Sequence, residues 1–526
     1  MKTQEKENTG ISLLKRKQYG LLRALFSRLG IIVLLLLLQV FALLFLTWRF
    51  EDYAPHVYTA MTVLAIAVVL YLINSSIDPT AKLTWLIIIT LTPVFGGLLL
   101  LYTQMDIGHR AVKSVTSRMV NSTRTAIPQD PTAMEALERE SPASAALARY
   151  ISRSGCYPAY ANTDVTYFPL GEDKFAALLT QLERAERFIF LEYFIIDEGL
   201  MWGRVLEILA RKAKAGVDVR VMYDGTCEFS TLSRDYPQRL QALGIQCKVF
   251  SPATPFLSTH YNYRDHRKIL VIDGHTAFTG GVNLADEYIN RIEKHGHWKD
   301  TAIMLQGEAV RSFTLMFLQI WNIFEKEPEY AAFLSCPTYP PKNAQGFVIP
   351  YGDCPLDQDK VGERVYMDIL NRAQTYVHIM SPYLILDGEM ETALKFAAER
   401  GVDVALILPA VPDKKMPFAL AMTHYASLME SGVRLYEYTP GFVHAKVFVS
   451  DDCKAVVGTI NMDYRSFYHH FECAAYLYKS ACIPAIEADF QDTLKKCRRV
   501  NWDTLHHGNM KRRLTGLLCK AVAPLM

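Results

Sequence analysis

The sequence has almost no net charge. Its 526 residues include 56 Lys and Arg against 54 Asp and Glu, which gives a formal net charge of +2. Proteins that bind nucleic acid through its phosphates usually carry a clear basic excess. The composition therefore gives no sign of bulk attraction to DNA or RNA, and we expect no nucleic-acid partner.

Cysteine pairs are missing as well. The ten cysteines form no CxxC motif and show no small-domain disulfide spacing, which is compatible with reduced thiols. The polar motifs described below lack the spacing of metal ligands. We therefore expect neither a metal ion nor another cofactor.

Charged side chains are also absent from three long runs near the N-terminus, at residues 31–48, 57–73 and 83–102. Their lengths approach the roughly 20 apolar residues that cross a bilayer. Buried core helices are the alternative, but three such runs so close together favour membrane helices. We expect a basic segment over residues 1–29 and a multi-pass membrane region over residues 30–103.

Two signals for the orientation of this region disagree. Seven Lys and Arg precede the first run, which favours a cytoplasmic N-terminus and, after three crossings, an external catalytic part. Four basic residues after the third run, between 110 and 124, favour the inside. Our hypothesis is a cell-membrane protein whose catalytic domain lies on the cytoplasmic face.

One polar pattern occurs twice in the same register. His266-x-Lys268-x4-Asp273 lies in HRKILVID, and the second copy lies in HAKVFVSD. The second copy consists of His444, Lys446 and Asp451. Each copy is followed at equal spacing by a glycine and an asparagine, which are Gly280, Asn283, Gly458 and Asn461. Such a repeat is far less expected by chance than one short match.

The repeated residue types suit cleavage of a phosphodiester. Both motifs are rich in β-branched residues and read as strands, on which His and Lys two apart share a face. One neutral imidazole can attack phosphorus while a second, protonated one gives its proton to the leaving alkoxide. Lysines and asparagines can stabilise the anionic transition state. Asp273 and Asp451 complete the motifs, although a structural role at a strand end is the more usual one for such residues.

The rest of the chain shows a second sign of duplication. AKAGVDV (213–219) aligns with AERGVDV (398–404), and strands alternate with helices on both sides. We expect two similar α/β halves, at residues 151–340 and 341–495, that share one active site. A connector at 104–150 precedes them, and a basic amphipathic tail at 496–526 follows them.

The paired motifs resemble those of the phospholipase D superfamily, over about residues 167–478. FLEYFIIDEG (190–199), HWKDTAIMLQG (297–307), SPYLILDGEM (381–390), the ending AVAPLM and the N-terminal membrane runs are similar to the bacterial cardiolipin synthases in particular. The resemblance implies two phospholipase D-like halves. It also implies a membrane phosphatidyltransferase that condenses two phosphatidylglycerol molecules to cardiolipin and glycerol, with phosphatidylglycerol and other anionic phospholipids as partners.

The resemblance also implies roles for residues. His266 would be the nucleophile that forms a phosphohistidine, and His444 the acid and base. Lys268, Lys446, Asn283 and Asn461 match the family's phosphate ligands.

An acidic residue downstream of each motif orients its His in the family. Glu472 fits that position in the second copy. In the first copy Lys294 is aligned there, and a short insertion around RIEKHG would restore Asp300. Thr459 stands where the first copy has Gly281 and is expected to touch phosphate.

Two other functions remain open from the sequence. One is a phospholipase D-type phosphodiester hydrolase, or a nuclease, that uses water as the acceptor. The other is an inactive membrane scaffold that binds anionic lipid, which two intact motifs make the weaker alternative. The acceptor alcohol and the oligomeric state are not indicated by the sequence.

Overall fold

The computed structural model describes residues 11–13, 41, 45, 48, 54–75, 77–92, 96–97, 99–100, 107–252, 263–323, 325–338, 341, 344–357, 359–506 and 510–525. These residues fall into two compact units. The larger unit covers residues 1–15, 113–253 and 262–516, and the smaller one covers 16–112, 254–261 and 517–526. Both polar motifs lie in the larger unit.

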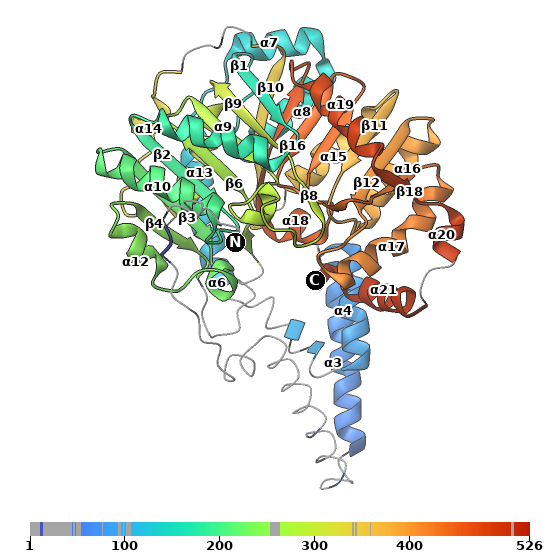
Figure 1. Cartoon of the computed structure of the whole chain (residues 1–526). Helices are drawn as coiled ribbons and strands as arrows, with labels where there is room; N and C mark the ends of the chain where they lie inside the picture. Colours follow the sequence, from blue (N-terminus) through green and yellow to red (C-terminus); the bar gives the residue numbers. More distant parts are fainter. Residues whose placement is uncertain are drawn as a thin grey trace, which may run out of the picture. The chain divides into compact units, whose positions relative to one another are not determined.

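The first half of the larger unit is built on a seven-stranded sheet, on the left of Figure 1. The strand order is β1-β9-β7-β6-β2-β3-β4. The strands are β1 (Thr163–Phe168), β2 (Phe188–Tyr193), β3 (Asp218–Asp224), β4 (Gln246–Phe250), β6 (Lys268–Ile272), β7 (Thr276–Gly280) and β9 (Ala302–Gly307). Strands β2, β3 and β4 are parallel, and the others join antiparallel to them.

The second half repeats this order in a sheet on the right of Figure 1, as β10-β17-β16-β15-β11-β12-β13 with β18 added at the edge. Its strands are β10 (Phe347–Asp353), β11 (Tyr376–Met380), β12 (Asp403–Pro409), β13 (Arg434–Tyr438), β15 (Val447–Ser450), β16 (Lys454–Gly458), β17 (His470–Tyr478) and β18 (Cys497–Arg499). Seven strands correspond one to one with those of the first sheet. The expected pair of similar α/β halves is thus confirmed.

The central strands carry apolar side chains on both faces of the sheets, and helices cover these faces and bury the side chains. The residues of β2, FIFLEY, are all buried, and the apolar face of α10 (Leu200–Lys214) packs on the same core. The first half also contains α9 (Gly171–Glu183), α11 (Cys227–Ser230), α12 (Tyr236–Gln241), η3 (Asp286–Ile289), α13 (Val310–Trp321) and α14 (Ala331–Leu334). The second half contains α15 (Val361–Arg372), α16 (Gly388–Glu399), α17 (Lys415–Glu430), α18 (Tyr464–Tyr468), α19 (Ile483–Leu494) and α20 (Trp502–His506).

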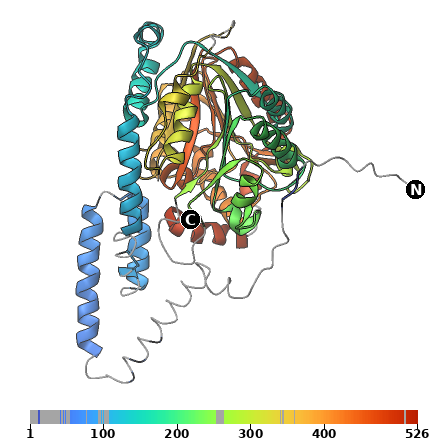
Figure 2. The same cartoon turned by 90° about the vertical axis from the view of Figure 1, so that its left-hand side faces the viewer.

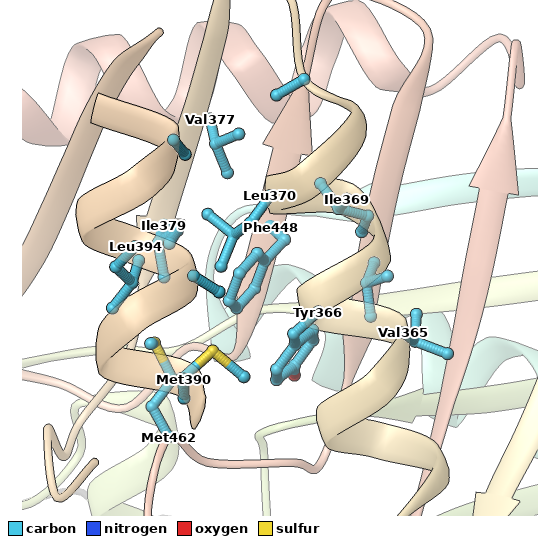
Figure 3. Packing of buried hydrophobic residues seen from close by; sticks show 14 of the residues in the cluster. Val365, Tyr366, Ile369, Leu370, Val377, Ile379, Met390, Leu394, Phe448 and Met462 are labelled. Carbon is cyan, nitrogen blue, oxygen red and sulfur yellow. The ribbon is translucent and has the colours of Figure 1, made fainter. Parts of the chain in front are cut away.

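The core of the second half shows how these layers hold together. Figure 3 shows side chains of α15, α16 and β11 interlocking around Phe448 of β15. The rings of Tyr366 and Phe448 stack with their centroids 3.9 Å apart. Burial of each large apolar side chain of this kind contributes about 1.5–3 kcal/mol. Two helices that precede the first half in the chain, α7 (Pro131–Glu140) and α8 (Pro142–Gly155), add residues such as Leu137 and Ile151 to this core.

The smaller unit contains α3 (Ala54–Asn74), a straight rod in blue in Figure 2, and α4 (Pro79–Leu91). Asp78 caps α4 by accepting hydrogen bonds from the backbone of Thr80 and Ala81. Two further helices, α6 (Ile107–Thr123) and α21 (Met510–Val522), have residues in both units, and η4 (Ala523–Leu525) ends the described chain.

Within the part of the chain that the structure describes, no helix is both long and apolar enough to span a membrane. Of the three charge-free runs, the first lies outside the described residues except at positions 41, 45 and 48. The second run falls on α3. The third begins on α4, and several of its later residues also lie outside the described part.

Candidate active site

The residues just before each motif histidine form a short strand that pairs with a strand of the other half. Strand β5 (Arg264–Asp265) directly precedes His266 and pairs in parallel with the start of β17 in the second half. Strand β14 (Gly441–Val443) directly precedes His444 and pairs in parallel with β8 (His297–Lys299) of the first half. The two crossings are related by the internal repeat, and each joins one half to the other.

Backbone hydrogen bonds continue both crossings as far as the histidines. The N–H of His266 donates to the carbonyl of Phe471 over 2.9 Å, and the N–H of His444 donates to that of Lys299 over 2.7 Å. The next residue along each receiving strand is an acid, Glu472 in one case and Asp300 in the other. Each imidazole therefore lies beside a carboxylate of the other half.

The carboxylates bind the histidines in this crossed arrangement. His266 Nδ1 lies 2.9 and 3.0 Å from the two carboxylate oxygens of Glu472, and His444 Nδ1 lies 2.6 Å from Asp300 Oδ2. All four side chains are buried. The sequence led us to expect each acid to orient the histidine of its own copy. That pairing is wrong, because the short parallel strands carry each histidine across to the other half.

Strand register explains why Asp300 is equivalent to Glu472 despite the unequal spacing. Gly280 pairs with Ala302 in the first sheet, and Gly458 pairs with Ala474 in the second. The two acids each lie two residues before those alanines. The extra residues, 291–296, lie between η3 and β8 and leave the register of the sheet unchanged.

The two motif lysines lie against their histidines. Lys268 Nζ donates to the His266 carbonyl over 2.5 Å, and Lys446 Nζ donates to the His444 carbonyl and lies 3.0 Å from His444 Nδ1. Burial lowers the pKa of Lys268 to about 8 and that of Lys446 to about 7, although the negative charge of Asp300 opposes the shift at both. The charge of Lys268 also acts on His444, so the two motifs form one electrostatic cluster.

Both imidazoles favour the neutral form. Burial lowers the pKa of His266 well below its usual 6.5, in spite of the attraction of Glu472. Burial and the charge of Lys446 lower the pKa of His444 to about 4. For Glu472, burial alone would raise the pKa, but His266 and His470 outweigh it and lower the pKa. A neutral His266 that donates its Nδ1 proton to an ionised Glu472 keeps the lone pair on Nε2 free for attack.

Glu472 has further donors that the sequence did not reveal. Ser466 Oγ donates to Glu472 Oε1 over 2.7 Å, and the hydroxyl of Thr459 donates to Oε2. We expected Thr459 to touch phosphate. Its hydroxyl proton is instead directed to Glu472, because the Thr459 side chain is fully buried behind that carboxylate. Ser466 lies on α18, in the loop that leads to β17, and no repeated spacing marks it in the sequence.

The two motif asparagines differ in their surroundings. Asn283 accepts from the backbone N–H of Ile195 through Oδ1 and donates to the hydroxyl of Tyr288 through Nδ2, so it ties together two segments of the first half. Asn461 Oδ1 is buried and has no hydrogen-bond partner among the described residues. Asn461 therefore keeps polar capacity for a ligand, whereas both polar atoms of the Asn283 amide are already in use.

The motif aspartates lie at the far ends of the motif strands. Asp273 accepts three backbone hydrogen bonds, from Glu186, Arg187 and Phe188, each over 2.8 Å. Asp451 accepts in the same way from residues 374–376. At about 3.3 Å per strand residue, each carboxylate starts roughly 16 Å along the chain from the motif lysine. Asp273 and Asp451 thus secure the strand that begins the neighbouring β-α unit, which is the structural role usual for a carboxylate at a strand end.

If Asp273 has this structural role, its replacement should lower the stability of the protein and leave its catalytic turnover nearly unchanged. Asp273→Ala leaves three backbone N–H groups without their acceptor, which should lower the free energy of unfolding by about 1–3 kcal/mol. We expect a melting temperature several degrees lower, with turnover per folded molecule within about threefold of wild type. Asp451→Ala is the matched variant in the other half. A large loss of turnover at an unchanged melting temperature would contradict the assignment.

The site contains two more buried residues that the sequence analysis did not predict. Lys174 on α9 donates to the hydroxyl of Tyr193 over 3.0 Å and to the carbonyl of Val282 over 3.2 Å. Burial lowers its pKa to about 7, although Asp300 opposes the shift. The ring of His470 lies 5.3 Å from that of His266. A single buried lysine on an amphipathic helix carries no pattern by which it could be found.

Known proteins match both the sequence and the fold. The family described as cardiolipin synthase, PLD-like domain, matches residues 178–321 and 366–494. An uncharacterised protein of Streptococcus mutans is 57% identical, over 87% of this chain and 99% of its own length. A cardiolipin synthase of Geobacillus sp. is 33% identical over 94% of this chain and 99% of its length, and one of Halalkalibacterium halodurans is 31% identical over 95% and 100%.

Among solved structures, a phosphatidylserine synthase of Haemophilus influenzae has a similar fold, with a TM-score of 0.56 and 14% identity over 72% of this chain and 97% of its own. The family match covers both halves and both histidine motifs. The relatives named as cardiolipin synthases extend over almost the whole chain. This chain belongs to the cardiolipin synthase family of proteins with phospholipase D-like domains.

Proposed function

We propose that this protein is a phosphatidyltransferase that joins two phosphatidylglycerol molecules into cardiolipin and releases glycerol. The observation that carries the proposal is the buried cluster in which two imidazoles are each held at Nδ1 by a carboxylate of the opposite half. Such a pair supplies one nucleophile and one proton carrier to a single phosphorus atom. Family membership supplies the substrate class.

In the first half-reaction, His266 Nε2 attacks the phosphorus of one phosphatidylglycerol. The P–N bond forms, the bond from phosphorus to the glycerol oxygen breaks, and His444 gives a proton to that oxygen. The resting His444 is neutral, with a pKa of about 4. The negative charge of the entering phosphodiester raises that pKa and allows His444 to take up the proton that it later donates.

In the second half-reaction, a glycerol hydroxyl of a second phosphatidylglycerol replaces the departed glycerol. His444 removes the proton of that hydroxyl, the oxygen attacks phosphorus, and the P–N bond breaks to restore His266. We infer that Lys268, Lys446 and Asn461 stabilise the charge on the phosphoryl oxygens, since ammonium and amide groups fixed in place need no reorganisation during the reaction. Asn283 contributes by holding the segment at Ile195 and Tyr288.

The identity of the acceptor is the direct test of this function. Purified full-length protein is incubated with vesicles of pure phosphatidylglycerol, and cardiolipin, phosphatidic acid and free glycerol are measured. We expect cardiolipin and glycerol in equal amounts. Phosphatidic acid as the sole lipid product would show water as the acceptor, and the protein would then be a phospholipase D-type hydrolase.

The pH dependence of kcat/KM should reflect the protonation of the two buried motif lysines and of His266. Lys446 and Lys268, with pKa values of about 7 and 8, lose charge as the pH rises, so kcat/KM should fall on the alkaline side across that range. His266 must be neutral to attack, and its pKa lies well below 6.5, so the acid limb should lie below pH 6.5. Bound phosphate stabilises the ammonium forms, so the alkaline limb of kcat should lie at higher pH. A rate that is flat from pH 5 to 9 would contradict this scheme.

We also propose that the charge-free runs 31–48, 57–73 and 83–102 anchor the protein in the cell membrane, with the catalytic halves on the cytoplasmic face. A lipid-borne acceptor favours a site held at the bilayer surface, because anchoring raises its effective concentration. Alkaline carbonate extraction should leave the protein in the membrane fraction. Labelling of Cys453, which is partly exposed, should require permeabilised cells. Release of the protein by carbonate would contradict the membrane anchor. Labelling of Cys453 in intact cells would contradict the cytoplasmic position of the catalytic halves.

A further inference from the structure

A third histidine lies beside the pair formed by His266 and Glu472. His470 opens β17, two residues before Glu472, and it is 7% exposed. Neither of its ring nitrogens has a hydrogen-bond partner among the described residues. Burying polar nitrogens in this way is unfavourable unless a ligand satisfies them. The proposed transfer reaction gives His470 no task.

The surroundings of His470 have the composition of a transition-metal site. His266, His470 and Glu472 each offer one ligand atom, and these three atoms lie within 4.8 Å of one another. Glu472 Oε1 is 2.9 Å from His266 Nδ1 and 3.7 Å from His470 Nδ1. Ligands of a tetrahedral zinc ion at about 2.0–2.1 Å from the metal lie about 3.3 Å apart. Both distances are within roughly 0.4 Å of that spacing.

Among the described residues of the first half, an aromatic ring takes the place of this third histidine. Two residues before each motif histidine, Arg264 pairs with His470, and Phe442 pairs with Trp298. Trp298 therefore occupies the position of His470 next to the other histidine–carboxylate pair, and an indole nitrogen is no metal ligand. The internal repeat thus provides a comparison, since one histidine–carboxylate pair has a third ligand beside it and the other has an aromatic ring.

We propose that His266, His470 and Glu472 bind a zinc ion that inhibits the enzyme. Two imidazoles and one carboxylate suit Zn²⁺, whereas Mg²⁺ and Ca²⁺ prefer oxygen ligands alone. The ion displaces the Nδ1 proton of His266, which passes to solvent, and a water molecule completes four-coordination. His266 then loses its hydrogen bond to Glu472, and the metal charge withdraws electron density from the ring that must attack phosphorus. The inhibitory effect rests on the proposed function, but zinc binding does not.

The test combines inhibition with a spectroscopic measurement on full-length protein in detergent micelles. Zn²⁺ should inhibit wild type, and Mg²⁺ or Ca²⁺ at the same concentration should not. His470→Asn should raise the Zn²⁺ concentration for half-inhibition by about 10- to 100-fold or more, with each variant compared with its own uninhibited rate. His275→Asn, at a partly exposed histidine in a β-turn of the first half, should behave as wild type. Inhibition should strengthen as the pH rises, because metal and protons compete for the imidazoles.

Cobalt reports on the same site without any need for activity. Co²⁺ added to wild type or to His275→Asn should give the visible absorption of a tetrahedral complex at one ion per chain, and Zn²⁺ should abolish it. His470→Asn should lack the band. Equal zinc sensitivity of wild type and His470→Asn, or no cobalt band in wild type, would overturn the proposal. A protein without transferase activity that still shows the His470-dependent band would refute the proposed function and keep the metal site.

Discussion

Replacement of His266 by Asn is expected to lower phosphatidyl transfer by about 10⁴-fold or more, because the covalent intermediate can no longer form. Asn keeps a polar amide next to Glu472 but has no nitrogen lone pair with which to attack phosphorus. The measurement is the initial rate of cardiolipin formation, together with the yield of phosphoenzyme in a rapid-quench experiment with phosphatidylglycerol labelled at phosphorus. Wild type should yield a phosphohistidine at position 266, and His266→Asn should yield none.

The His444→Asn variant distinguishes the proton donor from the nucleophile. With phosphatidylglycerol, loss of the proton donor should lower the rate by about 10²- to 10⁴-fold. With a phosphatidyl p-nitrophenyl ester, whose leaving group needs no protonation, His444→Asn should still release a burst of p-nitrophenol equal to the enzyme concentration. His266→Asn should release no burst from either substrate. A burst from His266→Asn and none from His444→Asn would reverse the assignment of the two histidines.

Replacement of Glu472 by Gln is the second change with a large expected effect, about 10³- to 10⁴-fold in kcat, since loss of the carboxylate beside a catalytic histidine leaves its tautomer unfixed. Glu472 holds Nδ1 of His266 and itself receives hydrogen bonds from Ser466 and Thr459. An amide can present its NH₂ group to Nδ1, which moves the imidazole proton to Nε2 and removes the attacking lone pair. Glu472→Asp should recover part of the lost rate.

A second histidine–glutamate pair provides the control. His378 Nδ1 lies 2.9 Å from both carboxylate oxygens of Glu487, outside the motif cluster. Glu487→Gln changes the same chemical contact and should leave kcat within about threefold of wild type. Glu472 also raises the pKa of His266 against the effect of burial, so Glu472→Gln should move the acid limb of its residual activity to lower pH. Equal losses in both variants, or an unmoved acid limb, would assign Glu472 a structural role only.

The local parts of the site could be predicted from the sequence. HRKILVID and HAKVFVSD predicted strands, and β6 and β15 form there because their β-branched and other apolar residues suit the buried centre of a sheet. Gly280 and Gly458, equally spaced from their motifs, end the strands β7 and β16, which pair antiparallel with β6 and β15 in the same way in both copies. The α/β halves followed from alternating strands and helices that align between the two copies.

The crossed contacts could not be predicted in the same way. They depend on β5 and β14, strands of two and three residues that pair with segments about 200 and 140 positions away in the chain. Strands of two or three residues are too short to show a hydrophobic periodicity in the sequence. Their pairing partners are determined by how the two halves pack together. The same packing decides that the hydroxyl of Thr459 faces Glu472, and that the carboxylate of Asp273 faces the backbone before β2.

A crystal structure of the full-length protein with vanadate tests the central claim most directly, because vanadate adopts the five-coordinate geometry of the phosphoryl group in transfer. One vanadium atom should be bonded to His266 Nε2, with the opposite apical oxygen within hydrogen-bond distance of His444 Nε2 and with Glu472 and Asp300 still on the Nδ1 atoms. Vanadate bound to only one of the two histidines, with the other ring turned away, would contradict a single site shared by the two halves.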